Sequence, residues 1–244
     1  MGGRSSTRGG AREIDRSPRR DGQGERRLPP VVAIVVAGTL YALLPDGLLF
    51  GPRLLIPVLE AVLLVAVVAT NPRRITRETR LSRYASLALT AVVLLTNLVA
   101  EGLLVHDLVT AGKSSGSTLL VAALQVWATN VIGFGLLYWE LDRGGPVARA
   151  RTPRNRMVLA DFRFSQDENA DAVVEVADGS SEKADWVPTF VDYLYVSTTN
   201  SSAFSPTDTM PLSHRAKALM GTQATAALLV TLLVIARAVS ALGG

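Results

Sequence analysis

Five long runs of apolar residues, separated by short polar segments, dominate the chain. A helix that crosses the bilayer needs about 20 predominantly apolar residues. The last three runs reach that length. The second is marginal and the first is short, and these two predict a helical hairpin with its turn at residues 45–53. The pattern predicts an all-α, polytopic transmembrane helical bundle of about five spans plus a short re-entrant or interfacial helix. The runs are Val31–Leu44, Leu54–Thr70, Tyr84–Val105, Thr118–Trp139 and Leu219–Val239.

Polar segments divide the chain into four regions. Residues 1–28 are rich in Gly, Ser and Arg and predict a disordered basic cytoplasmic tail. Residues 29–142 hold the first four runs, and residues 143–186 form a cytoplasmic linker that is Arg-rich and then acidic. Residues 187–244 hold a short helix, a polar loop and the last transmembrane helix. Short alternating apolar pieces within residues 157–186 predict either a small β-hairpin or a segment on the membrane surface.

The distribution of charge predicts the orientation of the chain in the membrane. The chain carries 25 Lys and Arg against 21 Asp and Glu, and the basic residues flank apolar runs. They therefore predict a lipid bilayer as the partner and no nucleic acid. Five Arg lie in residues 71–83 and five in 143–156, whereas residues 45–53 and 106–117 hold one basic residue each. By the positive-inside rule this predicts a multi-pass protein with a cytoplasmic N-terminus. The preference for Arg over Lys, together with the richness in Ala, Val and Gly, is typical of GC-rich bacterial codon use and indicates a bacterial inner membrane.

The segment before the last run is polar. A short amphipathic helix at about Pro188–Ser197 precedes the hydroxyl-rich run Thr198–Ser202. This run is too polar to face lipid, and irregular backbone at membrane depth is tolerated only inside protein or beside water. We therefore expect a surface or re-entrant helix and loop. The alternative is that residues 187–207 cross the membrane and give six spans.

Phe190 to Leu212 resembles, without a gap, the pore loop of two-helix potassium-channel modules. The F-x-D-x-L-Y-x-S pattern of the pore helix begins here at Phe190, and Asp208 and Pro211-Leu212 match the residues after the filter. The filter itself, T-V-G-Y-G-D in that family, is A-F-S-P-T-D here, so K⁺ selectivity is not implied. The resemblance implies a homo-oligomeric, channel-like protein. Its pore-loop candidates are Asp192, Ser197, Thr198, Thr199, Asn200, Ser205 and Asp208.

The layout of the whole chain also resembles an uncharacterised bacterial family of multi-span membrane proteins of unknown function. The shared features are several N-terminal spans, a Tyr-Trp end to the fourth span, and an acidic linker. An Asp-x-Leu-Tyr motif and a Ser-Pro-Thr-Asp motif then precede the last span. This resemblance implies no known activity.

Polar side chains inside the apolar runs are the second group of candidates. One interpretation is a polar path or proton relay centred on Glu101, because ionisable groups in lipid usually face a bundle interior or water. The other is that Glu101 lies near the outer interface and the amides make interhelical hydrogen bonds. The intramembrane candidates are Glu60, Asn97, Glu101, Gln125 and Asn130.

Catalytic and metal-binding chemistry is not indicated. Cysteine is absent, there are two histidines, and neither a hydrolase, a zinc-protease nor a phosphate-loop motif is present. Asp167 to Asp178 has oxygen-bearing residues at an EF-hand-like spacing, but Ala172 replaces the required Gly. We expect a solvated acidic linker that lies against residues 143–156. The sequence thus predicts no enzyme, no cofactor and no metal.

Two functional hypotheses follow from these observations. In the first, the chain is an ion channel-like or transport protein built on residues 187–240. In the second, it is a membrane scaffold or accessory subunit that transports nothing.

Overall fold

The computed structural model describes residues 24–70, 73–76, 79–110, 116–168, 174–182, 184–202 and 209–242. Most of the predicted tail, residues 1–23, lies outside the described residues. So does the loop 203–208, which contains the candidates Ser205 and Asp208.

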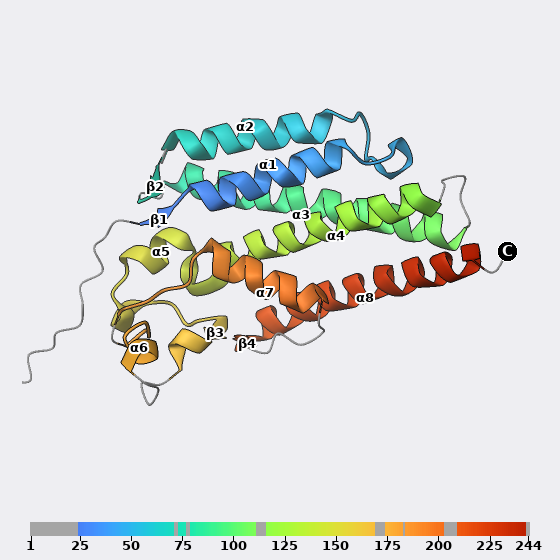
Figure 1. The fold of residues 1–244 in the computed structure, drawn as a ribbon. Helices are drawn as coiled ribbons and strands as arrows, with labels where there is room; N and C mark the ends of the chain where they lie inside the picture. The colour runs from blue at the N-terminus through green and yellow to red at the C-terminus, as the bar shows by residue number, and fades with distance from the viewer. Residues whose placement is uncertain are drawn as a thin grey trace, which may run out of the picture.

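Five long helices, lying side by side, form most of the molecule (Figure 1). The helices α1 and α2 cover one side of α3 and α4, and the shorter α7 lies with α8 on the other side. The helix α4 is central because it contacts α1, α3, α7 and α8. The helices are α1 (Leu28–Ala42), α2 (Leu55–Thr70), α3 (Arg80–Val109), α4 (Gly116–Leu141), α5 (Pro146–Arg151), α6 (Val174–Ala177), α7 (Phe190–Ser202) and α8 (His214–Leu242).

Three of these helices, α3, α4 and α8, are long and apolar enough to cross a membrane. This confirms a mostly helical protein whose longest helices, the three predicted long runs, have the length and composition of membrane spans. The helices α1 and α2 are apolar but have 15 and 16 residues, which is about 22–24 Å at 1.5 Å per residue. A bilayer core is about 30 Å thick. Three of the five predicted spans therefore have the length of a membrane-spanning helix, and the prediction of five spans is not confirmed.

Local sequence explains where these helices begin and end. Two prolines occupy the first turn of α1, where a missing N–H costs nothing. Thr79 and Ser82 form a reciprocal capping box at the start of α3, with nitrogen to oxygen distances of 3.0 and 3.1 Å. Past the end of α4, Arg143 and Gly145 both have positive φ, which turns the chain sharply into α5.

Two short antiparallel strand pairs add β-structure that the all-α prediction did not include. The strand β1 (Glu25–Arg26) pairs with β2 (Arg74–Ile75), and β3 (Phe162–Phe164) pairs with β4 (Thr209–Pro211). Of the two alternatives for residues 157–186, the small hairpin is therefore wrong for Phe162–Phe164, because their partner strand comes after α7 in the sequence. Phe162 and Phe164 are both buried and point into the core on the same face of β3.

The Arg-rich segments all lie at one end of the bundle, at the left in Figure 1. We call this the basic end; it comprises β1, β2, residues 143–156 and the start of α8. The connection between α1 and α2, the end of α3 and the end of α8 lie at the opposite end. The alternation of charge read from the sequence thus corresponds to a separation in space.

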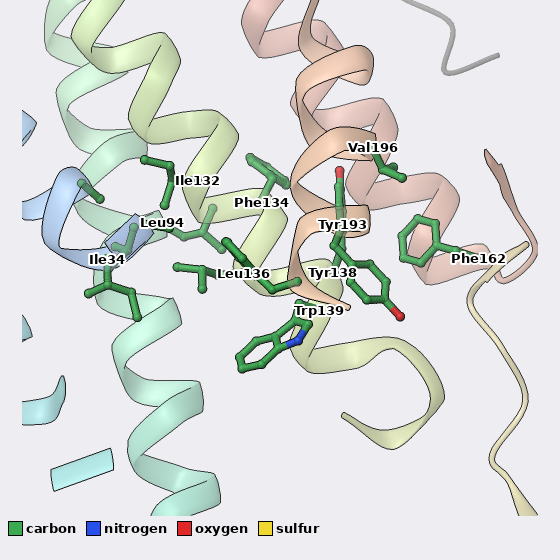
Figure 2. Close-up of a cluster of buried hydrophobic side chains, with 14 of the residues drawn as sticks. Ile34, Leu94, Ile132, Phe134, Leu136, Tyr138, Trp139, Phe162, Tyr193 and Val196 are labelled. Atoms are coloured by element: carbon green, nitrogen blue, oxygen red, sulfur yellow. The ribbon is translucent and has the colours of Figure 1, made fainter. Parts of the chain in front are cut away.

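Apolar side chains form one cluster near each end of the bundle. The cluster near the basic end spreads to both sides of α4, with Ile34 and Leu94 on one side and Tyr193 and Val196 on the other (Figure 2). Gly135 lets α7 approach α4 closely, because a Cβ there would lie 3.2 Å from the Cα of Leu194. The second cluster includes Tyr41, Leu48 and Leu104 near the opposite end.

The helix α7 enters the bundle from the basic end and does not cross it. It runs inward beside α4 and α8 until the Asn200 amide donates to the carbonyl of Met220, at 2.9 Å. The strand β4 is back at the basic end, paired with β3. The short helix predicted at Pro188–Ser197 therefore extends through the polar run to Ser202. The start of α7 and the strand β4 thus lie at the same end of the bundle.

Candidate functional site

A buried group of polar side chains joins α3, α4, α7 and α8 in the middle of the bundle. Gln223 of α8 is at its centre and is fully buried. Such side chains are costly in an apolar interior unless they bond to one another. We call this group the polar network; its members are Glu101, Asn130, Tyr138, Ser197, Asn200, Ser201 and Gln223.

Gln223 uses both ends of its amide. Its nitrogen donates to the hydroxyls of Ser197 at 2.6 Å and Ser201 at 2.8 Å. Its oxygen accepts from the Tyr138 hydroxyl at 2.7 Å and from the Asn200 amide at 3.0 Å. The inward end of α7 is therefore fixed to α8 and α4 by polar contacts as well as by apolar packing.

The network continues from α8 to a carboxyl group on α3. The Gln223 amide nitrogen lies 3.4 Å from the Asn130 oxygen, and the Asn130 nitrogen lies 3.5 Å from a carboxylate oxygen of Glu101. Both distances are at the long limit for a hydrogen bond, so these two contacts are the weakest of the network. Glu101 and Asn130 also line a small pocket, together with Val126, Trp127, Ala227 and Val230.

Some of the predicted site residues meet in this network. Glu101, Asn130, Ser197 and Asn200 do, although they come from three helices. Asn97 is a neighbour on α3 but donates instead to the carbonyl of Val126, at 2.8 Å. This arrangement supports the interhelical hydrogen-bonding interpretation of the two asparagines.

The other described pore-loop candidates have local roles. The Asp192 carboxylate accepts from the N–H and the hydroxyl of Thr189, at 2.7 and 2.8 Å, and so stabilises the start of α7. The hydroxyls of Thr198 and Thr199 donate to carbonyls of the preceding turn of the same helix. None of these three side chains takes part in the polar network.

Glu60 is a separate buried carboxyl group. It is 4% exposed, and its Oε2 atom has no hydrogen-bond partner among the described residues. It faces the backbone of α1 at Gly38, where a Cβ would lie 2.7 Å from that oxygen. Gln125 is likewise outside the network, and within the described part of the chain its side-chain oxygen has no partner.

Two network members, Tyr138 and Gln223, were not candidates in the sequence, and Ser201 was identified only as part of the hydroxyl-rich run. Gln223 carried a usable signal, because it is the one amide in the apolar run Leu219–Val239. In the sequence, Tyr138 stands out only as part of the Tyr-Trp end of the fourth apolar run. The sequence does not show that its hydroxyl points into the bundle.

A second polar group, the ionic cluster, closes the basic end. Asp142 is fully buried and accepts from the Tyr193 hydroxyl at 2.5 Å, from the backbone N–H of Asp161 at 2.6 Å, and from Arg143 at 3.1 Å. Arg149 is 1% exposed, donates to two backbone carbonyls, and has its guanidinium 4.9 Å from the Tyr193 ring. The cluster comprises Asp142, Arg143, Arg149, Asp161, Asp167, Tyr193 and Arg215.

The acidic linker lies against the Arg-rich stretch, as the sequence predicted. Arg143 pairs with Asp167 at 2.6 Å, and Arg154 pairs with Asp185 at 2.7 Å. Asp161 reaches further and accepts from the Ser213 hydroxyl and from Arg215 at the start of α8. Asp167, the first residue of the EF-hand-like spacing, is thus occupied by an ion pair.

Glu25 ties the start of the described chain to this end of the bundle. Its carboxylate accepts from the Trp139 indole at 2.8 Å and from the backbone N–H of Phe190 at 2.5 Å. Burial raises the pKa of Glu25 above its ordinary value, and these two hydrogen bonds offset only part of that rise. Glu25 therefore keeps its proton to a higher pH than an exposed carboxyl group does.

Comparisons of the chain with protein-family models, with curated proteins and with solved structures give no match. Both resemblances seen in the sequence therefore stay predictions. The polar network, with its carboxyl group, and the ionic cluster are the two features from which a function can be argued.

Proposed function

We propose that α1, α2, α3, α4 and α8 all cross the membrane, with the basic end in the cytoplasm of a bacterial cell and α7 re-entrant from that side. The separation of the Arg-rich segments from the opposite end supports this orientation. Exposed apolar side chains on α1 and α2, such as Val35, Val58 and Val62, support contact with lipid. Local thinning of the bilayer accommodates helices of this length.

Cysteine labelling tests this topology, because the chain has no native cysteine. We expect Asp46→Cys and Thr110→Cys, both at the opposite end, to react with a membrane-impermeant maleimide in intact cells. Ser165→Cys at the basic end should react only after permeabilisation. Labelling of Ser165→Cys in intact cells would reverse the orientation, and protection of Asp46→Cys alone would remove α1 and α2 from the spans.

Within this arrangement we infer a transport function for a proton or a small cation. The observation that carries this inference is the contact chain from Glu101 through Asn130 and Gln223 to the hydroxyls of α7. A carboxyl group inside a bundle is costly unless it is protonated or paired with a cation. The four apolar runs before α7 contain no Lys or Arg that could neutralise it.

Each residue then has a definite task. Glu101 holds the proton or cation, and Asn130 donates to its carboxylate. A change in the charge of Glu101 alters that long contact and, through Gln223, the contacts of α7. Because amide side chains do not pass protons on readily, Asn130 and Gln223 couple Glu101 to the re-entrant helix and do not act as a proton wire.

Flux into liposomes measures this function. We expect the purified protein, reconstituted in vesicles with a pH-sensitive dye and with Na⁺ or K⁺ gradients, to move one of these ions above the empty-vesicle rate. Glu101→Gln should lower that flux at least tenfold, because the amide neither binds nor releases a proton. Asp107→Asn is the matched control, since this carboxyl group is on the same helix and outside the network. Equal flux through the Glu101→Gln variant would contradict the role of Glu101.

A non-transporting scaffold or accessory subunit is the second candidate, and one observation favours it. Only 22% of the most apolar stretch of α8 is buried, compared with 67% for α4. The helix α8 therefore has a large exposed face that a second copy or another subunit could cover. A protein that passes no ion but cross-links as an oligomer through α8 would support this function. A homo-oligomer that does pass ions would support the channel-like one.

A further inference from the structure

The buried carboxyl group of Glu60 belongs neither to the polar network nor to the ionic cluster. Glu60 is 4% exposed and lies on the inner face of α2, which it shares with Ile56 and Val67, the two other buried residues of that helix. The sequences of α1 and α2 contain no other charged residue. A single ionisable group is therefore enclosed in an interface between two apolar helices.

The helix α1 leaves space for this carboxyl group. Gly38 faces it, and a Cβ at that position would lie 2.7 Å from the Oε2 atom of Glu60, so an alanine there would displace the carboxyl. The two polar side chains of α1 do not bind it. The Thr39 hydroxyl donates to a carbonyl of its own helix, and the Tyr41 hydroxyl bonds to the backbone of the loop before α2.

No cation of the described residues neutralises Glu60. Its Oε2 atom has no hydrogen-bond partner within this part of the chain, and its carboxyl group takes part in no ion pair there. Arg53, the nearest cation along the sequence, pairs with Asp46 at 2.5 Å and donates to two backbone carbonyls. The helix α3, which also packs against α2, has charged residues only in its first turn and from Glu101 onward. Its titratable side chains are Arg80, Arg83, Tyr84, Glu101, His106 and Asp107.

An unpaired carboxylate in an apolar interface is strongly unfavourable, whereas the protonated acid is neutral. We propose that Glu60 is a second proton-binding site, separate from Glu101, and that the contact between α1 and α2 depends on its proton. The carboxylate that remains after release of the proton needs water, and water reaches it only when α1 and α2 move apart. This site goes beyond the transport proposal and does not require it.

Infrared spectroscopy of the purified full chain in detergent detects the proton, because a protonated carboxyl group absorbs separately from a carboxylate. At neutral pH we expect Glu60→Gln to lose the protonated-carboxyl absorption of one group, both in the unmodified chain and in the Glu101→Gln background. Glu168→Gln is the matched control, since that side chain is 52% exposed, and it should lose none. Equal absorption of the Glu60→Gln variant and the unmodified protein would overturn the proposal.

A hydrophobic carbodiimide tests the same site without a variant. The O–H of a protonated carboxyl group adds across a C=N bond of the reagent, with the proton passing to nitrogen, and the adduct rearranges to a stable N-acylurea. Peptide mass spectrometry should locate this product at Glu60 and not at Glu168. Thermal unfolding shows whether Glu60→Gln is folded. If it is not, the carbodiimide experiment decides, and absence of the product at Glu60 would overturn the proposal.

Spin labels on α1 and α2 measure the effect of the proton on packing. Val36→Cys and Val62→Cys place the labels at exposed positions of the two helices. We expect the distances between the labels to shift to larger values at alkaline pH, and to stay constant when Glu60 is glutamine. Constant distances in both proteins would overturn the dependence of the α1–α2 contact on the proton. A protein that passes these tests but moves no ion would contradict the transport proposal alone.

Discussion

Replacing Asp142 with alanine is expected to lower the free energy of unfolding by about 3–5 kcal/mol, the range for removal of one partner from a buried ion pair. Asp142 is fully buried and accepts hydrogen bonds from Tyr193, from Arg143 and from the backbone N–H of Asp161. Without its carboxylate, the Tyr193 hydroxyl and the Arg143 guanidinium lose a partner inside the core. The ends of α4 and α7 should then separate at the basic end.

Tryptophan fluorescence during thermal unfolding in detergent measures this effect, because Trp139 and Trp186 pack in the core at the basic end. Asp46→Ala is the matched control: Asp46 also pairs with an arginine, Arg53, but its side chain is 90% exposed. An exposed pair of this kind contributes little to stability. If both alanine variants unfold at the same temperature as the unmodified protein, the ionic cluster does not stabilise the fold.

Replacing Gln223 with leucine is expected to disrupt the polar network. It removes the partner of Tyr138, Asn200, Ser197 and Ser201 at once. Interhelical hydrogen bonds in membranes contribute about 0.6 kcal/mol each on average, so the loss of four corresponds to about 2–3 kcal/mol. The inward end of α7 should lose its fixed position even where the rest of the bundle stays folded.

A single reporter cysteine at Ser201 would show that local release. We expect Ser201→Cys to react with a thiol reagent at least tenfold faster when Gln223 is leucine than when it is glutamine. Gln125→Leu is the control with the same chemical change, because within the described residues the side-chain oxygen of Gln125 has no partner. Equal reaction rates in the two leucine backgrounds would show that Gln223 does not hold α7.

The main helices were predictable from the sequence because a long apolar run is stable only when it is buried in lipid or in the bundle, and a helix satisfies its backbone there. Their ends were less predictable. The helix α3 starts at Arg80, four residues before the apolar run, because the Thr79 capping box supports a polar first turn. Likewise α7 continues to Ser202. The carbonyl of Met220 accepts from the Asn200 amide and Gln223 donates to the Ser201 hydroxyl, so these polar side chains have hydrogen-bond partners inside the bundle.

The strand pairs were not predictable in the same way. Each strand has two or three residues. The partner of β3 is β4, which follows α7 in the sequence. The polar candidates were found as residue types, but their roles needed three-dimensional contacts. Nothing local in the sequence distinguishes Ser197, which faces Gln223, from Thr198, which bonds to its own helix.

The ionic cluster also has a consequence for the order of biosynthesis. Asp161 takes its partners, Ser213 and Arg215, from 52 and 54 residues later in the chain. During translation, α1 to α4 are therefore complete long before that carboxylate is paired. The basic end can be completed only after the start of α8 has left the ribosome. A nascent chain stopped before residue 209 would hold four complete apolar helices and an unfinished basic end, with the Asp161 carboxylate exposed to water.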